Sequence, residues 1–192
     1  MGSLLFLAVI VGTLPAQAHV EGDMAGGLTA GLWHPISGLD HVLAMVAVGL
    51  WGAQLGKPAV WTLPVAFPLV MAFGAFMGLM GIGLPGVEIG IAVSGIALGA
   101  MVLAEAKPPL WFAAALVGLF AIFHGHAHGT ELPEDASGVL YSIGFVTATG
   151  CLHGCGIAIG LVHRWPVGRI VLRAAGAVVA TGGCLFLWRA VA

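Results

Sequence analysis

The chain has 192 residues and a formal net charge of −2; 60 % of its residues are hydrophobic and only 7 % are charged. Soluble domains carry roughly 25 % charged residues, so this composition excludes a soluble globular protein and predicts an integral membrane protein. The sequence also lacks the basic patch that nucleic-acid binding requires, so we expect no nucleic-acid partner. The expected surroundings of the chain are the lipid bilayer.

Residues 1–18 have the pattern of a cleaved signal peptide. Residues 4–14 form an apolar run that is too short to span a bilayer. Ala16-Gln17-Ala18 then supplies the small residues of a cleavage site. One part of the pattern is missing, because no Lys or Arg precedes the run. We expect cleavage after Ala18, which makes His19 the first residue of the mature chain.

His19 is a candidate metal ligand if the leader is removed. Its free amine and its imidazole can together chelate an ion, and the acidic residues Glu21 and Asp23 follow it closely. The alternative is a polar tail that takes no part in binding.

Residues 19–192 are predicted to form a single all-α membrane domain of about six transmembrane helices. An apolar helix needs about 20 residues to cross the hydrocarbon core, and six stretches come close to that length. Most prolines fall between these stretches or in first helical turns. Pro64 and Pro68 lie inside the second stretch, where we expect a kink. The six predicted spans are residues 35–55, 60–82, 87–105, 109–130, 138–162 and 169–190.

Glycine pairs four residues apart are predicted to bring helix backbones into close contact. The chain contains 31 glycines, which is roughly double the ordinary usage. Small residues at this spacing let a neighbouring membrane helix approach closely. The pairs concerned are Gly74/Gly78, Gly95/Gly99 and Gly150/Gly154.

The charges of the connections predict the orientation in the membrane. Loops that stay in the cytoplasm carry an excess of Lys and Arg. Lys57, Lys107 and Arg164 fall in three alternate connections, and Arg169 and Arg173 lie close to the last of these. The segments on the other side carry mainly acidic residues. Both termini are therefore predicted to face the periplasm.

Two polar motifs fall at matching depth in separate spans. The first span opens with His34-Pro35-Ile36-Ser37-Gly38-Leu39-Asp40-His41. A residue before proline avoids helical geometry, so His34 is expected at the helix entrance. At 1.5 Å per residue, His41 lies about 9 Å below this entrance, and His124 lies about 10 Å below Glu131 in a span that runs outward. Both motifs are thus predicted to lie in the outer half of the membrane.

The residue types of the two motifs predict a metal site. His124, His128 and Glu131 are spaced i, i+4 and i+7 and share one helix face, whereas His126 points elsewhere. Ionisable side chains at membrane depth are expensive and usually mark an ion or substrate pathway. Imidazole and carboxylate suit first-row divalent metals such as nickel, cobalt, zinc or iron. The predicted ligands are Asp40, His41, His124, His128 and Glu131; for each histidine alone, the alternative is a satisfied polar group in a helix interface.

Three further features admit two interpretations each. Glu88 begins the third span on the outer side, where it either joins the site or stabilises the start of its helix. His153, deeper in the fifth span, either relays an ion inward or hydrogen-bonds a carbonyl. Cys151 and Cys155 are spaced i, i+4 and are either a soft metal site or small packing residues.

The two motifs resemble the signature segments of a known family. HPISGLDH and FHGHAHGTE, at residues 34–41 and 123–131, are similar to the HPxxGxDH and FHGxAHGxE segments of the hydrogenase/urease accessory nickel permeases (HupE/UreJ). The resemblance extends to the leader, the six spans and the histidine after the cleavage site. It implies that the functional residues are His34, Asp40, His41, His124, His128 and Glu131.

The resemblance also implies a function. It predicts a secondary permease that moves nickel, or cobalt in some members, across the bacterial inner membrane to supply hydrogenase or urease assembly. The metal is then the transported substrate, no cofactor is expected, and the chain is not an enzyme. Two alternatives remain: a membrane-embedded zinc-dependent hydrolase, whose metal keeps one coordination position open, and a metal sensor or buffer that binds without transport.

Overall fold

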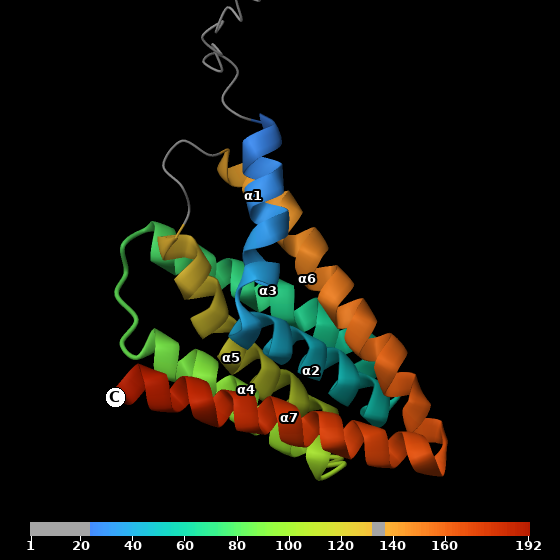
Figure 1. Ribbon diagram of the computed structural model, residues 1–192. Coiled ribbons are helices and arrows are strands. Elements are labelled where there is room, and N and C mark those ends of the chain that lie inside the picture. Colours follow the sequence, from blue (N-terminus) through green and yellow to red (C-terminus); the bar gives the residue numbers. More distant parts are fainter. Residues whose placement is uncertain (1–23, 132–136) are drawn as a thin grey trace, which may run out of the picture.

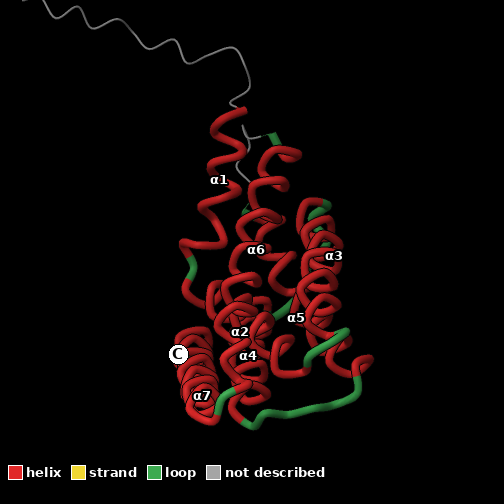
Figure 2. The backbone as a smooth tube through the Cα atoms, turned by 90° about the vertical axis from the view of Figure 1, so that its right-hand side faces the viewer, coloured by secondary structure: helices red, strands yellow, loops and turns green. Residues whose placement is uncertain are grey.

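The computed structural model describes residues 24–131 and 137–192, and all regular secondary structure within these ranges is helical. The predicted signal peptide and His19 lie outside the described residues. Figures 1 and 2 show α1 and the start of α6 extending above the other helices. The elements are α1 (Met24–Ser37), α2 (Leu39–Leu55), α3 (Ala59–Leu79), α4 (Val87–Leu103), α5 (Leu110–Thr130), α6 (Gly138–Gly160), a 3-10 turn (Leu161–Arg164) and α7 (Pro166–Val191).

Four helical segments are long and apolar enough to cross a bilayer: α3, α5, α6 with the 3-10 turn, and α7. They correspond to the predicted spans 60–82, 109–130, 138–162 and 169–190. The predicted span 87–105 is α4, whose 17 residues fall short of the usual length of about 20. The all-helical architecture is thus confirmed for the described residues. Six complete spans are not established, because the same residues contain four, or five if α1 and α2 together count as one.

The predicted first span, 35–55, is not one helix. It belongs to α1 and α2, whose axes meet at 81°. His34 and Pro35 lie in the last turn of α1 rather than at the entrance of a new helix, and the break falls at Gly38. Gly38 has an extended backbone, and a Cβ there would lie 2.9 Å from the Asp40 carboxylate and 3.2 Å from the His41 ring. The absence of a side chain at Gly38 therefore lets the chain turn directly beside these two residues.

The connections that carry basic residues lie together at one end of the bundle. Trp51 of α2 donates a hydrogen bond from Nε1 to the carbonyl of Ala106, at 3.0 Å. Arg169, at the start of α7, pairs with Glu105 at 3.0 Å. These contacts join the ends of α2 and α4 to the start of α7, at the lower right of Figure 1. The break between α1 and α2 and the end of α5 lie away from this end.

Glycines set the closest helix contacts. The predicted glycine pairs on α3 and α4 lie against the backbones of α5 and α7, respectively, as expected. On α6, Gly144 packs against α1 and Gly156 against α2, so both parts of the broken helix lie along the same partner. The prediction for Gly150 and Gly154 is wrong, because no described atom lies within 4 Å of a Cβ built at either position.

Gly74→Ala is expected to destabilise the bundle, because a Cβ at this position overlaps the carbonyl oxygen of Ile122 on α5. Overpacking of this kind costs about 1–3 kcal/mol. The melting temperature of the purified protein in detergent measures the loss. Gly150→Ala is the matched control, since its new methyl group meets no described atom and alanine favours helix by up to about 1 kcal/mol. Equal melting temperatures for the two variants would contradict the packing role of Gly74.

Candidate metal centre

A cavity of about 240 Å³ lies where α1 breaks and α5 ends. Both sequence motifs contribute to its walls, together with the start of α4. A larger cavity of about 850 Å³ opens between α3 and α6, but its lining is mainly apolar, and His128 and Gly129 are the motif residues that reach it. The polar cavity is therefore the candidate site. Its lining residues are His34, Ser37, Gly38, Asp40, His41, Glu88, Ala127, His128 and Glu131.

Four imidazole rings form a continuous row from this cavity into the core. The ring centroids of His34 and His128 lie 4.7 Å apart, and those of His128 and His41 lie 4.5 Å apart. His41 and His124 follow at 4.7 Å. The side chains of His34 and His41 are 28 % and 12 % exposed, whereas His128 and His124 are 4 % and 0 % exposed. The row thus leads from the surface into the dry interior.

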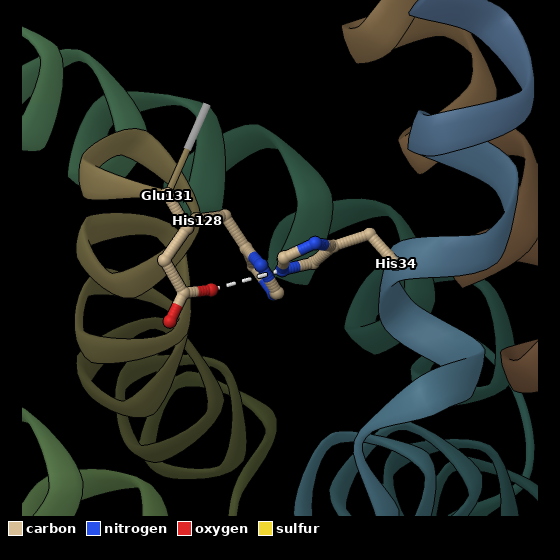
Figure 3. Close-up of side chains that lie close together, drawn as sticks. All are labelled: His34, His128 and Glu131. Carbon is tan, nitrogen blue, oxygen red and sulfur yellow. Dashed lines mark ion pairs between the residues drawn. The ribbon is translucent and has the colours of Figure 1, made fainter. Parts of the chain in front are cut away.

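At the outer end of the row, His34, His128 and Glu131 form a compact set of potential ligands. Each offers one ligand atom, and the three atoms lie within 4.8 Å of one another. Figure 3 shows His34 reaching from α1 toward His128 and Glu131 at the end of α5, with His34 Nε2 3.0 Å from Glu131 Oε2. Two atoms bound to one ion at about 2.1 Å lie at most about 4.2 Å apart. Small side-chain movements therefore bring this set to coordination distances.

Asp40 orients the His41 ring. One carboxylate oxygen, Oδ1, accepts hydrogen bonds from the backbone N–H of His41 and from its ring Nδ1, both at 2.9 Å. An ionised carboxylate only accepts hydrogen bonds, so the proton of the neutral ring lies on Nδ1. The lone pair is then on Nε2, which is buried and has no partner among the described residues. A carboxylate that holds the far nitrogen of a histidine is a common partner of metal ligands.

Ser94 orients the His124 ring in the same way. The serine hydroxyl donates its hydrogen to the carbonyl of Ile91 at 2.6 Å. It can therefore only accept from His124 Nε2, which lies 2.9 Å from it. The proton of a neutral His124 is consequently on Nε2, and the lone pair is on the buried Nδ1, which has no partner among the described residues.

The imidazole row contains several buried ring nitrogens that lack a hydrogen-bond partner among the described residues. His41 Nε2, His124 Nδ1 and both ring nitrogens of His128 have no hydrogen-bond partner in the described part of the chain. An unsatisfied buried polar group costs about 1–3 kcal/mol. Such groups are ordinarily rare, and their concentration in one place is typical of a functional site. Neutral imidazole nitrogens with free lone pairs are also the commonest metal ligands.

The remaining sequence candidates lie at the edge of the site or outside it. Glu88 is in the first turn of α4 and lines the cavity, which is compatible with both of its interpretations. His126 points away from the row and lies 2.8 Å from the carbonyl of Ile82 through Nε2. Cys151 and Cys155 are on an exposed part of α6 and do not line the cavity. His19 lies outside the described residues.

Sequence reasoning missed two side chains around the row. Ser94 contacts His124, and the ring of Tyr141 on α6 lies 5.8 Å from that of His34. A serine within the apolar stretch of α4 is a detectable signal, although its partner cannot be found without the packing of α4 on α5. Tyr141 is the single tyrosine of the chain, and no spacing relates it to either motif.

Comparisons with known proteins cover almost the whole chain. Residues 7–186, which include both histidine motifs, match the model of the HupE / UreJ protein family. The chain is 48 % identical over 175 residues to Protein HupE of Rhizobium leguminosarum bv. viciae, across 91 % of this chain and 92 % of that protein. No solved structure matches it significantly. As the motifs predict, the chain belongs to the HupE/UreJ family.

Proposed function

We propose that the chain is a secondary permease that carries nickel, or cobalt, from the periplasm to the cytoplasm through its His/Asp/Glu site. The observation that carries the proposal is the row of imidazoles from the partly exposed His34 to the fully buried His124. A hydrolase or a buffer needs one coordination sphere, whereas successive ligands between a partly exposed and a fully buried histidine suit an ion that moves. Membership of the HupE/UreJ family, which implies metal supply to hydrogenase or urease assembly, supports the same substrate.

The donor atoms suit a divalent ion that must also leave. Imidazole and carboxylate bind first-row metals, and the charges of Asp40 and Glu131 offset that of the cation. The three cysteines of the chain are exposed and do not line the cavity, so no thiolate holds the ion there. Transport requires binding that is weak enough for release. Because neutral imidazoles bind the ion, we expect binding to weaken in acid.

We assign the cavity to the periplasmic side of the bacterial inner membrane. The connections with Lys and Arg lie at the end where Trp51 contacts Ala106 and Arg169 pairs with Glu105. The positive-inside rule assigns that end to the cytoplasm. The cavity lies toward the other end, so the ion enters from the periplasm and moves toward the proteins that assemble metalloenzymes. Both termini are then periplasmic.

Flux through purified protein in liposomes tests the proposal. Nickel added outside is expected to reach a metal-sensitive dye inside faster than in protein-free liposomes, and cobalt is expected to compete. Zinc and magnesium complete the panel and define the selectivity. A zinc hydrolase, a sensor or a buffer binds metal without moving it. Protein that binds nickel and gives no flux would therefore contradict the permease.

Ser94→Ala is expected to weaken nickel binding about tenfold, because His124 then loses the contact that fixes its tautomer and ring orientation. Calorimetric titration of the detergent-purified protein measures the affinity. Ser142→Ala is the matched control, since this exposed serine on α6 donates to the carbonyl of Gly138 and lies outside the polar cavity. Unchanged affinity in Ser94→Ala would contradict the orienting role.

A further inference from the structure

Beyond the inner end of the imidazole row lies one more buried histidine. His153 on α6 is 1 % exposed, and neither of its ring nitrogens has a hydrogen-bond partner among the described residues. His153 and His124 both contact the ring of Phe67 on α3. The centroid of this ring lies 5.5 Å from that of His124 and 5.4 Å from that of His153. Both imidazoles are therefore in contact with one fully buried phenylalanine.

Oxygen atoms are available around His153. Thr149 precedes it by one helical turn on the same face of α6, and its hydroxyl is buried without a partner in the described chain. On α3, Pro68 has no N–H to donate to the carbonyl of Pro64 four residues earlier. The backbone of Pro64 interacts with the His153 ring, although the contact falls short of regular hydrogen-bond geometry. The His153 imidazole thus lies near a backbone carbonyl, and a buried hydroxyl lies one helical turn away on the same face of α6.

A packing role alone does not explain this arrangement. A histidine that only fills space in an apolar interface keeps at least one ring nitrogen hydrogen-bonded, because an unpaired one costs about 1–3 kcal/mol. Here the hydroxyl of Thr149 has no partner among the described residues, and neither nitrogen of His153 has one of regular hydrogen-bond geometry there, since the Pro64 backbone supplies only the contact described above. The site lies further along the proposed path: α6 runs away from the cavity, and His153 is about 18 Å beyond Tyr141, which borders His34.

We propose that His153, with Thr149, forms an inner metal-binding station, and that Phe67 is the apolar barrier between it and the outer row. The inference rests on the proposed permease function and extends its path beyond the two sequence motifs. Nitrogen and oxygen ligands suit the same divalent cations as the outer row. A second weak site allows an ion to leave the first without returning to the periplasm.

His153→Gln separates binding from transport. In proteoliposomes it is expected to lower nickel flux at least about tenfold, while calorimetric affinity at the outer row stays within about threefold of the unsubstituted chain, since no outer ligand changes. His163→Gln is the matched control, because this ring lies in the 3-10 turn and bonds the carbonyl of Gly160. It should leave both quantities unchanged.

Two further variants test the inner station and the barrier if His153→Gln does not fold. Thr149→Val keeps the shape of the side chain and removes its hydroxyl, and is expected to lower flux several-fold. Phe67→Leu keeps an apolar side chain but removes the ring, and is expected to raise flux. Unchanged flux in folded His153→Gln, or in folded Thr149→Val where the first variant fails, overturns the station; unchanged flux in Phe67→Leu overturns the barrier.

The outcomes also separate this inference from the function on which it rests. Absence of nickel flux in the unsubstituted protein would contradict the proposed permease function itself. Normal flux in His153→Gln, together with loss of flux when His124 is replaced, would support the permease function and contradict only the inner station. A loss of nickel binding in His153→Gln equal to the loss of flux also contradicts a separate station, because it makes His153 part of the outer site.

Discussion

His124→Ala is expected to lower nickel uptake by cells roughly a hundredfold at limiting nickel. The ring is fully buried, its centroid lies 4.7 Å from that of His41, and Nδ1 has no other partner in the described chain. Alanine removes the innermost ligand of the row. The ring of Phe67, whose centroid lies 5.5 Å away, is apolar and cannot replace it as a ligand. Uptake of radioactive nickel by cells with equal amounts of each variant measures the effect.

His126→Gln is the control for this experiment. His126 lies two residues further along α5, and its Nε2 lies 2.8 Å from the carbonyl of Ile82, outside the row. Glutamine retains a donor for that carbonyl, so uptake should remain close to that of the unsubstituted chain. Normal uptake by well-expressed His124→Ala would contradict the row as the path of the ion. An equal loss of uptake in both variants would mean that disturbance of α5 as a whole, rather than loss of a ligand, causes the effect.

The helices that could be predicted are those whose sequence alone determines their length. In α3, α5, α6 and α7 an apolar stretch of about 20 residues is bounded by prolines or charged connections, and the structure contains all four. The bend between α1 and α2 could not be predicted in the same way. The sequence indicated Pro35 as a helix start, but proline fits into the last turn of α1. The break depends instead on Gly38, whose missing Cβ leaves room for Asp40 and His41.

The meeting of the two motifs could be predicted from depth, but the contacts within the site could not. Arithmetic along one helix from Pro35 placed His41 at the depth of His124; their rings are in contact, although α1 and α2 meet at 81° and the assumed single helix is wrong. The pairing of Ser94 with His124 depends on how α4 packs against α5. The same limit explains the error at Gly150 and Gly154, because spacing identifies a smooth helix face but not whether another helix covers it.

The helix ends around the cavity have a consistent electrostatic arrangement. The C-terminal ends of α1 and α5, which carry His34 and Glu131, direct the negative ends of their dipoles toward it. The N-terminal ends of α2 and α4 direct the positive ends of their dipoles toward the cavity, which disfavours a cation there. Each of these helices has an acidic residue in its first turn, Asp40 in α2 and Glu88 in α4. These carboxylates offset the unfavourable ends. A broken helix whose ends border an ion site is a recurrent feature of secondary transporters.

Asp40 consequently has two roles, and its substitution is expected to have the second large effect. Asp40→Ala removes the negative charge at the start of α2 and the acceptor of the His41 Nδ1 proton. We expect nickel affinity to fall by about tenfold to a hundredfold. Asp40→Asn retains an acceptor oxygen and loses the charge, so its loss of affinity should be smaller. Calorimetric titration in detergent gives both affinities.

Histidine NMR of the same Asp40 variants distinguishes the two roles. In the unsubstituted chain and in Asp40→Asn, neutral His41 should carry its proton on Nδ1, because the Oδ1 acceptor at 2.9 Å is kept. In Asp40→Ala the ring should populate both tautomers, so that Nε2 is available to the ion for only part of the time. Glu105→Gln is the charge control, since Glu105 pairs with Arg169 and does not line the cavity. An equal loss of affinity in Glu105→Gln would mean that net charge, rather than the orientation of His41, governs binding.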